Sequence, residues 1–143
     1  MSILLQFVFG LACLAALNTA LVTCYNVRPE IVKAAEASLQ FMECCEKAIG
    51  SHFCTQSLCN FDKIKPYQVL MDSFICKKKV RPIWDCASQK KDHTSCCSNR
   101  NVEPSCLSLC NGTKKVDWRT TKPISCLQYF KEIVECFVED RFT

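Results

Sequence analysis

The residues of this sequence that most resemble catalytic machinery are an Asp-His pair and the two cysteines that follow it. Asp92 precedes His93, and Cys96-Cys97 comes shortly after. A histidine oriented by a carboxylate is how general bases are built. Side chains adjacent in sequence seldom reach that geometry, and an aspartate followed by Thr94 before a helical turn is typical of a helix cap. No distinct nucleophile motif accompanies the pair. We therefore expect a structural role for it, and no catalytic residues.

The remaining histidines and cysteines do not suggest a metal or cofactor site. Structural zinc needs Cys-x-x-Cys knuckles or Cys and His at ligand spacing, and neither His52 nor His93 lies in such a pair. Secreted phospholipase A2 is the enzyme most easily confused with a small helical, cysteine-rich protein. The phospholipase motif Cys-Cys-x-x-His-x-x-Cys is absent, because the residues after Cys44-Cys45 and after Cys96-Cys97 do not match it. A Gly-rich calcium loop is also lacking. The sequence predicts no enzyme, metal or cofactor.

Cysteine is the most informative residue type, with 14 in 143 residues. That fraction is typical of disulfide scaffolds, which form in exported proteins. Removing an amino-terminal segment that contains the first two leaves an even set, from which we predict six disulfides. The twelve cysteines that remain are Cys44, Cys45, Cys54, Cys59, Cys76, Cys86, Cys96, Cys97, Cys106, Cys110, Cys126 and Cys136.

Geometry restricts how these cysteines pair, although the full connectivity stays open. Adjacent cysteines rarely bridge each other. The two members of the pair Cys44-Cys45 should therefore bond to two different segments, and so should the two members of Cys96-Cys97. Cys126 and Cys136 are ten residues apart, or about 15 Å along a helix, too far for a mutual disulfide. We therefore expect two different segments to hold the carboxy-terminal helix.

The amino terminus has the character of a secretory signal peptide. Residues Ile3 to Val22 form an apolar run ahead of the first charge at Arg28. Cutting after Cys24 removes Cys13 and Cys24 together and preserves an even cysteine count. We predict a signal peptide over residues 1–24 and a secreted, extracellular product without a stable membrane span. An uncleaved anchor of about 20 residues is the alternative.

The mature chain, residues 25–143, is predicted to be one all-α domain. Its cysteines are spread evenly, no repeat or low-complexity tract interrupts it, and no strand alternation is convincing. Three glycines and 22% charged residues exclude collagen-like and highly charged disordered chains. Helical spacing of apolar residues predicts helices over 29–49, from Pro66 to the lysines at 77–79, over 82–91 and 102–110, and at the carboxyl terminus.

Two of these helices carry specific expectations. In the carboxy-terminal helix, Ser125 and Gln128 read as a capping box. The apolar stripe that follows is Leu127, Phe130, Ile133, Val134 and Phe137. In the helix over 102–110, Cys106 and Cys110 should share one face and point toward the same segment.

The segment Asp92-His93-Thr94-Ser95-Cys96-Cys97, followed by Val102 and Cys106-x-x-x-Cys110-Asn111-Gly112, resembles the DB module. This family is found mainly in nematode extracellular proteins and has twelve cysteines thought to form six disulfides. The resemblance covers about residues 41–136 and keeps all twelve cysteines in order. It implies an extracellular module and supplies no catalytic residues.

Charge and one sequence motif suggest contacts outside the chain. Residues 61–125 hold thirteen Lys and Arg against six Asp and Glu, within an overall net charge of +4. This basic region could meet a polyanionic glycan, although a solvated face is the favoured interpretation and nucleic acid is not expected in the exported compartment. Asn111-Gly112-Thr113 is a glycosylation sequon. We predict a non-enzymatic interaction or matrix module with an unknown extracellular partner, the alternatives being an effector or inhibitor, or a small secreted hydrolase.

Overall fold

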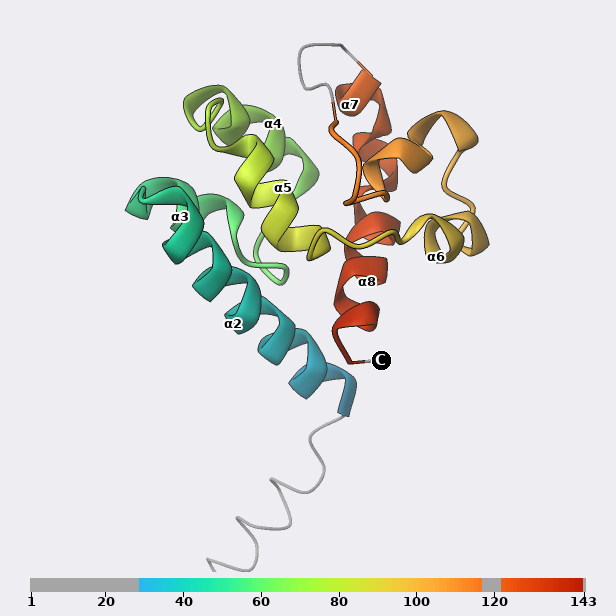
Figure 1. The fold of residues 1–143 in the computed structure, drawn as a ribbon, viewed down its shortest axis with the longest axis horizontal. Helices are drawn as coiled ribbons and strands as arrows, with labels where there is room; N and C mark the ends of the chain where they lie inside the picture. The colour runs from blue at the N-terminus through green and yellow to red at the C-terminus, as the bar shows by residue number, and fades with distance from the viewer. Residues whose placement is uncertain (1–28, 117–121, 143) are drawn as a thin grey trace, which may run out of the picture. The chain divides into compact units, whose positions relative to one another are not determined.

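The computed structural model describes residues 29–116 and 122–142. The chain forms two compact units, Met1–Val32 and Lys33–Thr143, and only the last four residues of the first unit are described. The predicted signal peptide therefore lies outside the described residues. The described part is helical, with one isolated antiparallel bridge between Asp92 and Asn111 and no strand (Figure 1). The all-α, disulfide-rich class predicted from the sequence is confirmed.

Helix α2, Pro29–Ile49, is the longest element and has the bounds that its sequence predicts. It begins at a proline, whose fixed φ suits the first turn of a helix, with Glu30 next to it. It ends before Gly50, whose φ of +61° is a left-handed conformation that glycine adopts without strain. Its buried face consists of Ala37, Ser38, Phe41, Cys45 and Ile49.

Three short helices follow α2: α3 (His52–Leu58), α4 (Pro66–Ile75) and α5 (Val80–Ser88). Sequence periodicity did not predict α3, whose seven residues span two turns and are capped by the Ser51 side chain. Helix α4 starts at Pro66, as predicted. Helix α5 starts two residues before Pro82, since a proline is tolerated in the first helical turn.

The carboxy-terminal elements are α6 (Thr94–Asn99), the 3-10 helix η1 (Pro104–Leu109), α7 (Lys122–Ser125), the 3-10 helix η2 (Cys126–Tyr129), α8 (Phe130–Glu139) and η3 (Asp140–Phe142). The predicted capping box is wrong. Ser125 has helical dihedral angles and makes no capping side-chain bond, because α7 has already begun at Lys122. The predicted apolar stripe is present, and Phe130, Ile133 and Phe137 are buried.

Six disulfides join the twelve cysteines in two separate groups. Three lie within residues 44–86 and three within residues 96–136, which we call the first and second disulfide groups. The bridges are Cys44–Cys86, Cys45–Cys59, Cys54–Cys76, Cys96–Cys136, Cys97–Cys110 and Cys106–Cys126. All but Cys44 and Cys96 are buried, so the bridges form part of the core.

Most geometric expectations about the cysteines are confirmed. Members of each adjacent pair have different partners, and two different segments hold Cys126 and Cys136. The expectation that Cys106 and Cys110 point to one segment is wrong. Their segment is a 3-10 helix, in which residues three apart share a face and residues four apart do not.

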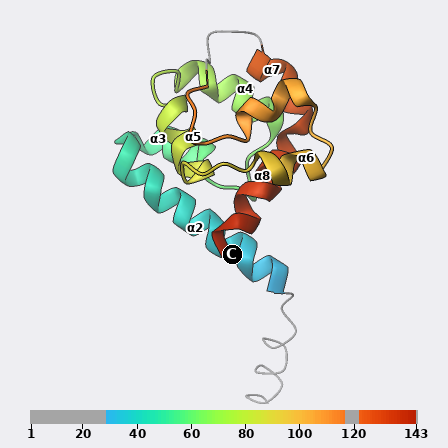
Figure 2. The same ribbon diagram turned by 45° about the vertical axis from the view of Figure 1, so that its right-hand side comes forward.

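The two disulfide groups meet along α5 and α8. These helices pack against each other, while α6 packs on both η1 and α8. Figures 1 and 2 show α3, α4 and α5 on one side of this unit and α6 and α8 on the other. The Trp84 and Phe137 rings meet edge to face, with centroids 5.4 Å apart. The chain crosses between the groups at Gln89 and Lys90, which both have positive φ angles.

Candidate functional site

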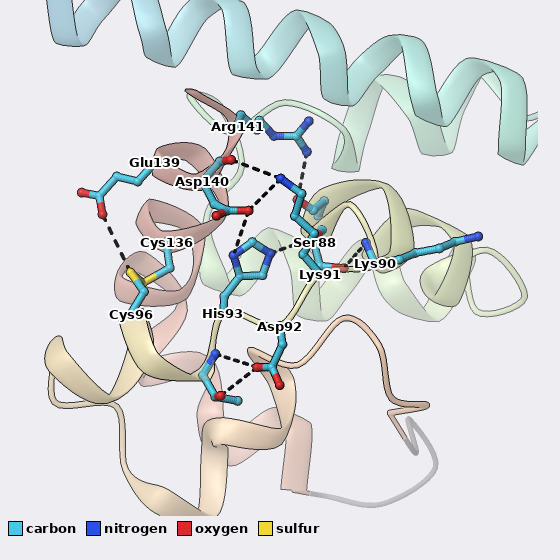
Figure 3. Close-up of polar contacts among 12 residues, drawn as sticks. Ser88, Lys90, Lys91, Asp92, His93, Cys96, Cys136, Glu139, Asp140 and Arg141 are labelled. Carbon is cyan, nitrogen blue, oxygen red and sulfur yellow. Dashed lines mark hydrogen bonds and ion pairs between the residues drawn. A yellow bond between two sulfur atoms is a disulfide. The ribbon is translucent and has the colours of Figure 1, made fainter. Parts of the chain in front are cut away.

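The Asp-His pair lies in the crossing segment between the two disulfide groups. His93 is 4% exposed, and its Nε2 atom lies 2.8 Å from the carbonyl oxygen of Ser88. Because a carbonyl oxygen only accepts, Nε2 is the donor. Nδ1 lies 3.9 Å from Asp140 Oδ2, and the ring meets Phe137 edge to face. Figure 3 shows the imidazole between Ser88 and Asp140. Its polar atoms face the protein interior.

Asp92 points away from the histidine and organises the start of α6. Its Oδ1 atom accepts from the Thr94 backbone N–H at 2.9 Å and from the Thr94 hydroxyl at 2.7 Å. These two hydrogen bonds lower the pKa of the Asp92 carboxyl below its ordinary value of 3.8. Neither Cys96 nor Cys97 is a free thiol. Asp92 therefore closes a turn just before α6, as the sequence indicated, although the N-cap residue itself is His93, which is buried.

The three residues of the sequon all have contacts in the folded chain. Asn111 is 6% exposed, and its Nδ2 atom, which would carry a glycan, donates to Asp92 Oδ2 at 2.6 Å. Thr113 donates to Asn111 Oδ1 from its backbone nitrogen and its hydroxyl. A side chain at Gly112 would clash with Ser88 and with the Lys91 carbonyl. Glycosylation of Asn111 stays a prediction, and it would have to precede the folding of this turn.

Arg141 is a site residue that the sequence analysis missed. Its guanidinium donates to the carbonyl oxygens of Cys86 and Ala87 at 2.8 and 2.9 Å, and it lies over the Phe61 ring at 5.2 Å. A cation is favourable at the carboxyl end of a helix, here α5. Burial lowers the pKa of Arg141 to about 10, so it stays charged at neutral pH. Arg141 therefore joins the carboxyl terminus to the first disulfide group.

A large apolar cavity lies among α4, α5, η2 and α8. It encloses about 910 Å³, within the range of roughly 300–1,000 Å³ that is usual for small-molecule sites. Its buried lining residues include the aromatic and aliphatic side chains of Phe41, Phe61, Ile83, Phe130 and Phe137. The sequence predicted several of these residues as core but gave no sign that they enclose a space.

Part of the predicted basic region lies at this cavity. Among the described residues that line the cavity, the charged ones are Lys77, Arg81 and Lys115, and all three are exposed. Lys77 follows α4, Arg81 lies in the first turn of α5, and Lys115 precedes α7 in the chain. The structure thus brings together cations from three segments, whereas Lys78 and Lys114 do not line the cavity.

The other side of α4 is an exposed apolar surface. No residue of α4 is buried, although the helix is largely apolar. Tyr67, Met71 and Ile75 are 60–71% exposed, and their spacing of four residues is that of one helical stripe. Contiguous exposed apolar surface commonly marks an interaction site. We call these three residues the α4 stripe.

Within residues 29–116 and 122–142, no group of three or more His, Cys, Asp or Glu side chains is arranged to hold a metal ion. In that same part of the chain, no helix has the length and apolar character needed to span a membrane.

These features define a small, helical, disulfide-rich module of the extracellular type. The family model named DB module matches residues 44–137, and the chain belongs to that family. A curated relative, Ig-like and fibronectin type-III domain-containing protein 2 of Caenorhabditis elegans, is 27% identical over 75 residues. The match covers 52% of this chain and only 5% of the relative. No solved structure matches the chain.

Proposed function

We propose that this protein is a secreted, non-enzymatic interaction module that binds an extracellular partner protein through the α4 stripe. Membership of the DB module family and the six disulfides support an extracellular setting. The relative's name includes Ig-like and fibronectin type-III domains, which supports a role in protein contacts. The buried His93 and the disulfide-bonded Cys96 and Cys97 leave the most enzyme-like motif without an accessible nucleophile.

The observation that carries this proposal is the exposure of the α4 stripe. Helix α4 is anchored at its carboxyl end by the Cys54–Cys76 bridge, so its backbone is held while its outer side chains remain in water. Apolar and aromatic side chains on a rigid element are suited to the centre of a protein interface. Burying them against a partner would remove the cost of their hydration.

The lysines that follow α4 indicate the charge of the partner. Lys77, Lys78 and Lys79 lie directly after the stripe and before α5. They favour an acidic rim around the partner's apolar contact. They would give a polyanionic glycan only weak binding, because salt screens exposed charges beyond about 8 Å at physiological ionic strength. Retention on heparin that persists in molar salt would contradict this expectation.

The proposal is tested with the secreted full-length protein and two matched variants. The double variant Met71→Glu/Ile75→Glu places charge in the stripe without touching the cavity lining. Leu39→Glu is the control, because Leu39 is 57% exposed on α2. Partners in extracellular fluid are identified by cross-linking and mass spectrometry. We expect the double variant to lose its partner and the control to keep it.

Two results would redirect the proposal. Equal partner recovery by all three proteins would exclude the α4 stripe as the interface. Turnover of a lipid, ester, glycan or peptide substrate by the purified protein would make it an enzyme instead. If the cross-linked partner is itself an enzyme that loses activity in the complex, the protein is an inhibitor, the alternative considered from the sequence.

A further inference from the structure

The cavity has a lining that distinguishes it from an ordinary surface hollow. Twenty-one residues line it, and four of them are polar: Ser73, Lys77, Arg81 and Lys115. The Ser73 hydroxyl donates to the Leu70 carbonyl oxygen of its own helix at 2.8 Å. Among the lining residues that the structure describes, none is acidic. In the described part of the lining, the buried side chains are therefore apolar and the charged groups are all cations.

Trp84 is the largest side chain of the lining, and its one polar atom is already hydrogen-bonded within the protein. The Trp84 Nε1 atom donates to the Leu109 carbonyl oxygen at 3.1 Å, and the indole packs edge to face with Phe137. A ligand with hydroxyl or amide groups along its length would lose hydrogen bonds with water and gain few in return. A ligand with an unbranched hydrocarbon body loses none. The lining thus favours an acyl chain.

The three cations fit the other end of such a ligand. Lys77, Arg81 and Lys115 line the cavity and are exposed. Long cationic side chains of this kind can cover an apolar surface with their hydrocarbon stems while their charged ends stay in water. An arginine can bind both oxygens of a carboxylate, and lysines add charge around it. The cavity therefore combines a mostly apolar lining with three exposed cations, which we call its cationic mouth.

We propose that the cavity binds one free long-chain fatty acid, with its acyl chain among the buried aromatic residues and its carboxylate at Lys77, Arg81 and Lys115. This is a second binding activity, at a lining that does not include Tyr67, Met71 or Ile75 of the α4 stripe. A single-chain ligand fits better than a bilayer surface, because the apolar groups concerned line a concave space of about 910 Å³.

The direct test is calorimetric titration of the delipidated, disulfide-intact full-length protein with laurate, myristate and palmitate below micelle formation. Saturable binding of one fatty acid per protein is expected. Each added methylene should tighten binding about fourfold until the cavity is filled. The methyl ester of laurate should bind about tenfold or more weakly than laurate, because it lacks the charge that the cationic mouth recognises.

Variants separate the headgroup site from the acyl site. Lys77→Gln/Arg81→Gln/Lys115→Gln should weaken laurate binding about tenfold or more and leave methyl laurate unchanged. Lys78→Gln, the neighbouring lysine outside the lining, is the control and should bind like the original protein. Leu70→Trp should reduce the affinity for all three fatty acids by occupying the cavity. Unchanged thermal unfolding of the variants keeps the comparison interpretable.

Three outcomes would overturn the proposal. These are no saturable fatty acid binding, equal affinities for laurate and its methyl ester, and an affinity that does not depend on chain length. Binding to phosphatidylserine vesicles without binding of monomeric fatty acid would indicate a membrane surface instead. Because Met71→Glu/Ile75→Glu leaves the lining unaltered, that variant should bind palmitate normally, so the failure of either proposal is distinguishable from the failure of the other.

Discussion

Asp92 and His93 are neighbours in sequence, but their side chains point in different directions and have different partners. The Asp92 carboxylate accepts hydrogen bonds from Thr94 and Asn111, whereas the His93 ring donates to the Ser88 carbonyl oxygen. Asp92 is consequently exposed at the start of α6, while His93 is buried against Phe137. The geometry that makes them a capping group and a core residue is what prevents them from acting as a catalytic pair.

Removing the imidazole should destabilise the protein strongly. His93→Ala leaves a space beside Phe137 and removes the donor to the Ser88 carbonyl oxygen, and we expect a loss of about 2–4 kcal/mol in unfolding free energy. His52→Ala is the control, since His52 is exposed, and should change stability by less than about 0.5 kcal/mol. Urea unfolding with the disulfides intact measures both. Equal effects of the two substitutions would contradict the structural role of His93.

Asp92 should contribute to stability in a pH-dependent way. Hydrogen bonds from Thr94 lower its pKa in the folded protein, so folding favours the ionised carboxylate. The contribution is present at neutral pH and is lost as the pH falls below 3.8 and through the lowered pKa. Thermal unfolding of the original protein and of Asp92→Asn should therefore converge in acid. A gap between them that stays constant from neutral to acidic pH would exclude this role.

At the scale of elements, sequence patterns were reliable where a helix carried its own signals. The α2 helix has a proline at its start, Gly50 beyond its end and a periodic apolar face, and its bounds are as predicted. The short elements α3 and α6 offer too few residues to display a period. The segment over 102–110 became a 3-10 helix, with a Cys110 N–H to Leu107 bond, in a stretch that two disulfides hold.

The cavity and the Arg141 site depend on contacts between distant elements, which periodicity does not reveal. Val69, Leu70 and Phe74 were correctly placed on one face of α4, but that face lines a cavity instead of a closed core. Arg141 is a single basic residue near the end of the chain, and its partners Cys86 and Ala87 precede it by more than fifty residues. Its sequence neighbours gave no signal for that contact.

Arg141 should be needed for the docking of η3 against α5. Arg141→Met keeps most of the hydrocarbon stem but leaves the Cys86 and Ala87 carbonyl oxygens without this donor, and we expect a loss of about 2–3 kcal/mol. Arg141→Lys should recover part of it, because a lysine retains the charge at the end of α5 but not the planar fork. Lys131→Met is the control, since the Lys131 side chain is 81% exposed. Similar chemical unfolding of Arg141→Met and Lys131→Met would contradict this account.

At the scale of the whole molecule, the two disulfide groups are held together without a covalent cross-link between them. Among the described residues, the contacts that join the groups include the Trp84 bond to Leu109, the ring contact of Trp84 with Phe137 and the Arg141 bonds to α5. Each group is cross-linked internally, which restricts its own unfolded chain. The fatty acid cavity is lined from both groups, so occupancy should strengthen their association.

The separation of the disulfides into two groups gives a prediction that does not depend on function. Every bridge closes before residue 87 or opens after residue 95, so none crosses the segment between them. Trypsin cutting of the urea-unfolded, unreduced protein at Lys90 or Lys91 should release two sets of peptides that separate without a reductant. Mass spectrometry should find Cys126 linked to Cys106 and Cys136 linked to Cys96, within the second set. A disulfide-linked peptide that joins a cysteine of the first group to one of the second would refute this connectivity, and with it the arrangement in which only side-chain contacts and one crossing segment hold α5 against α8.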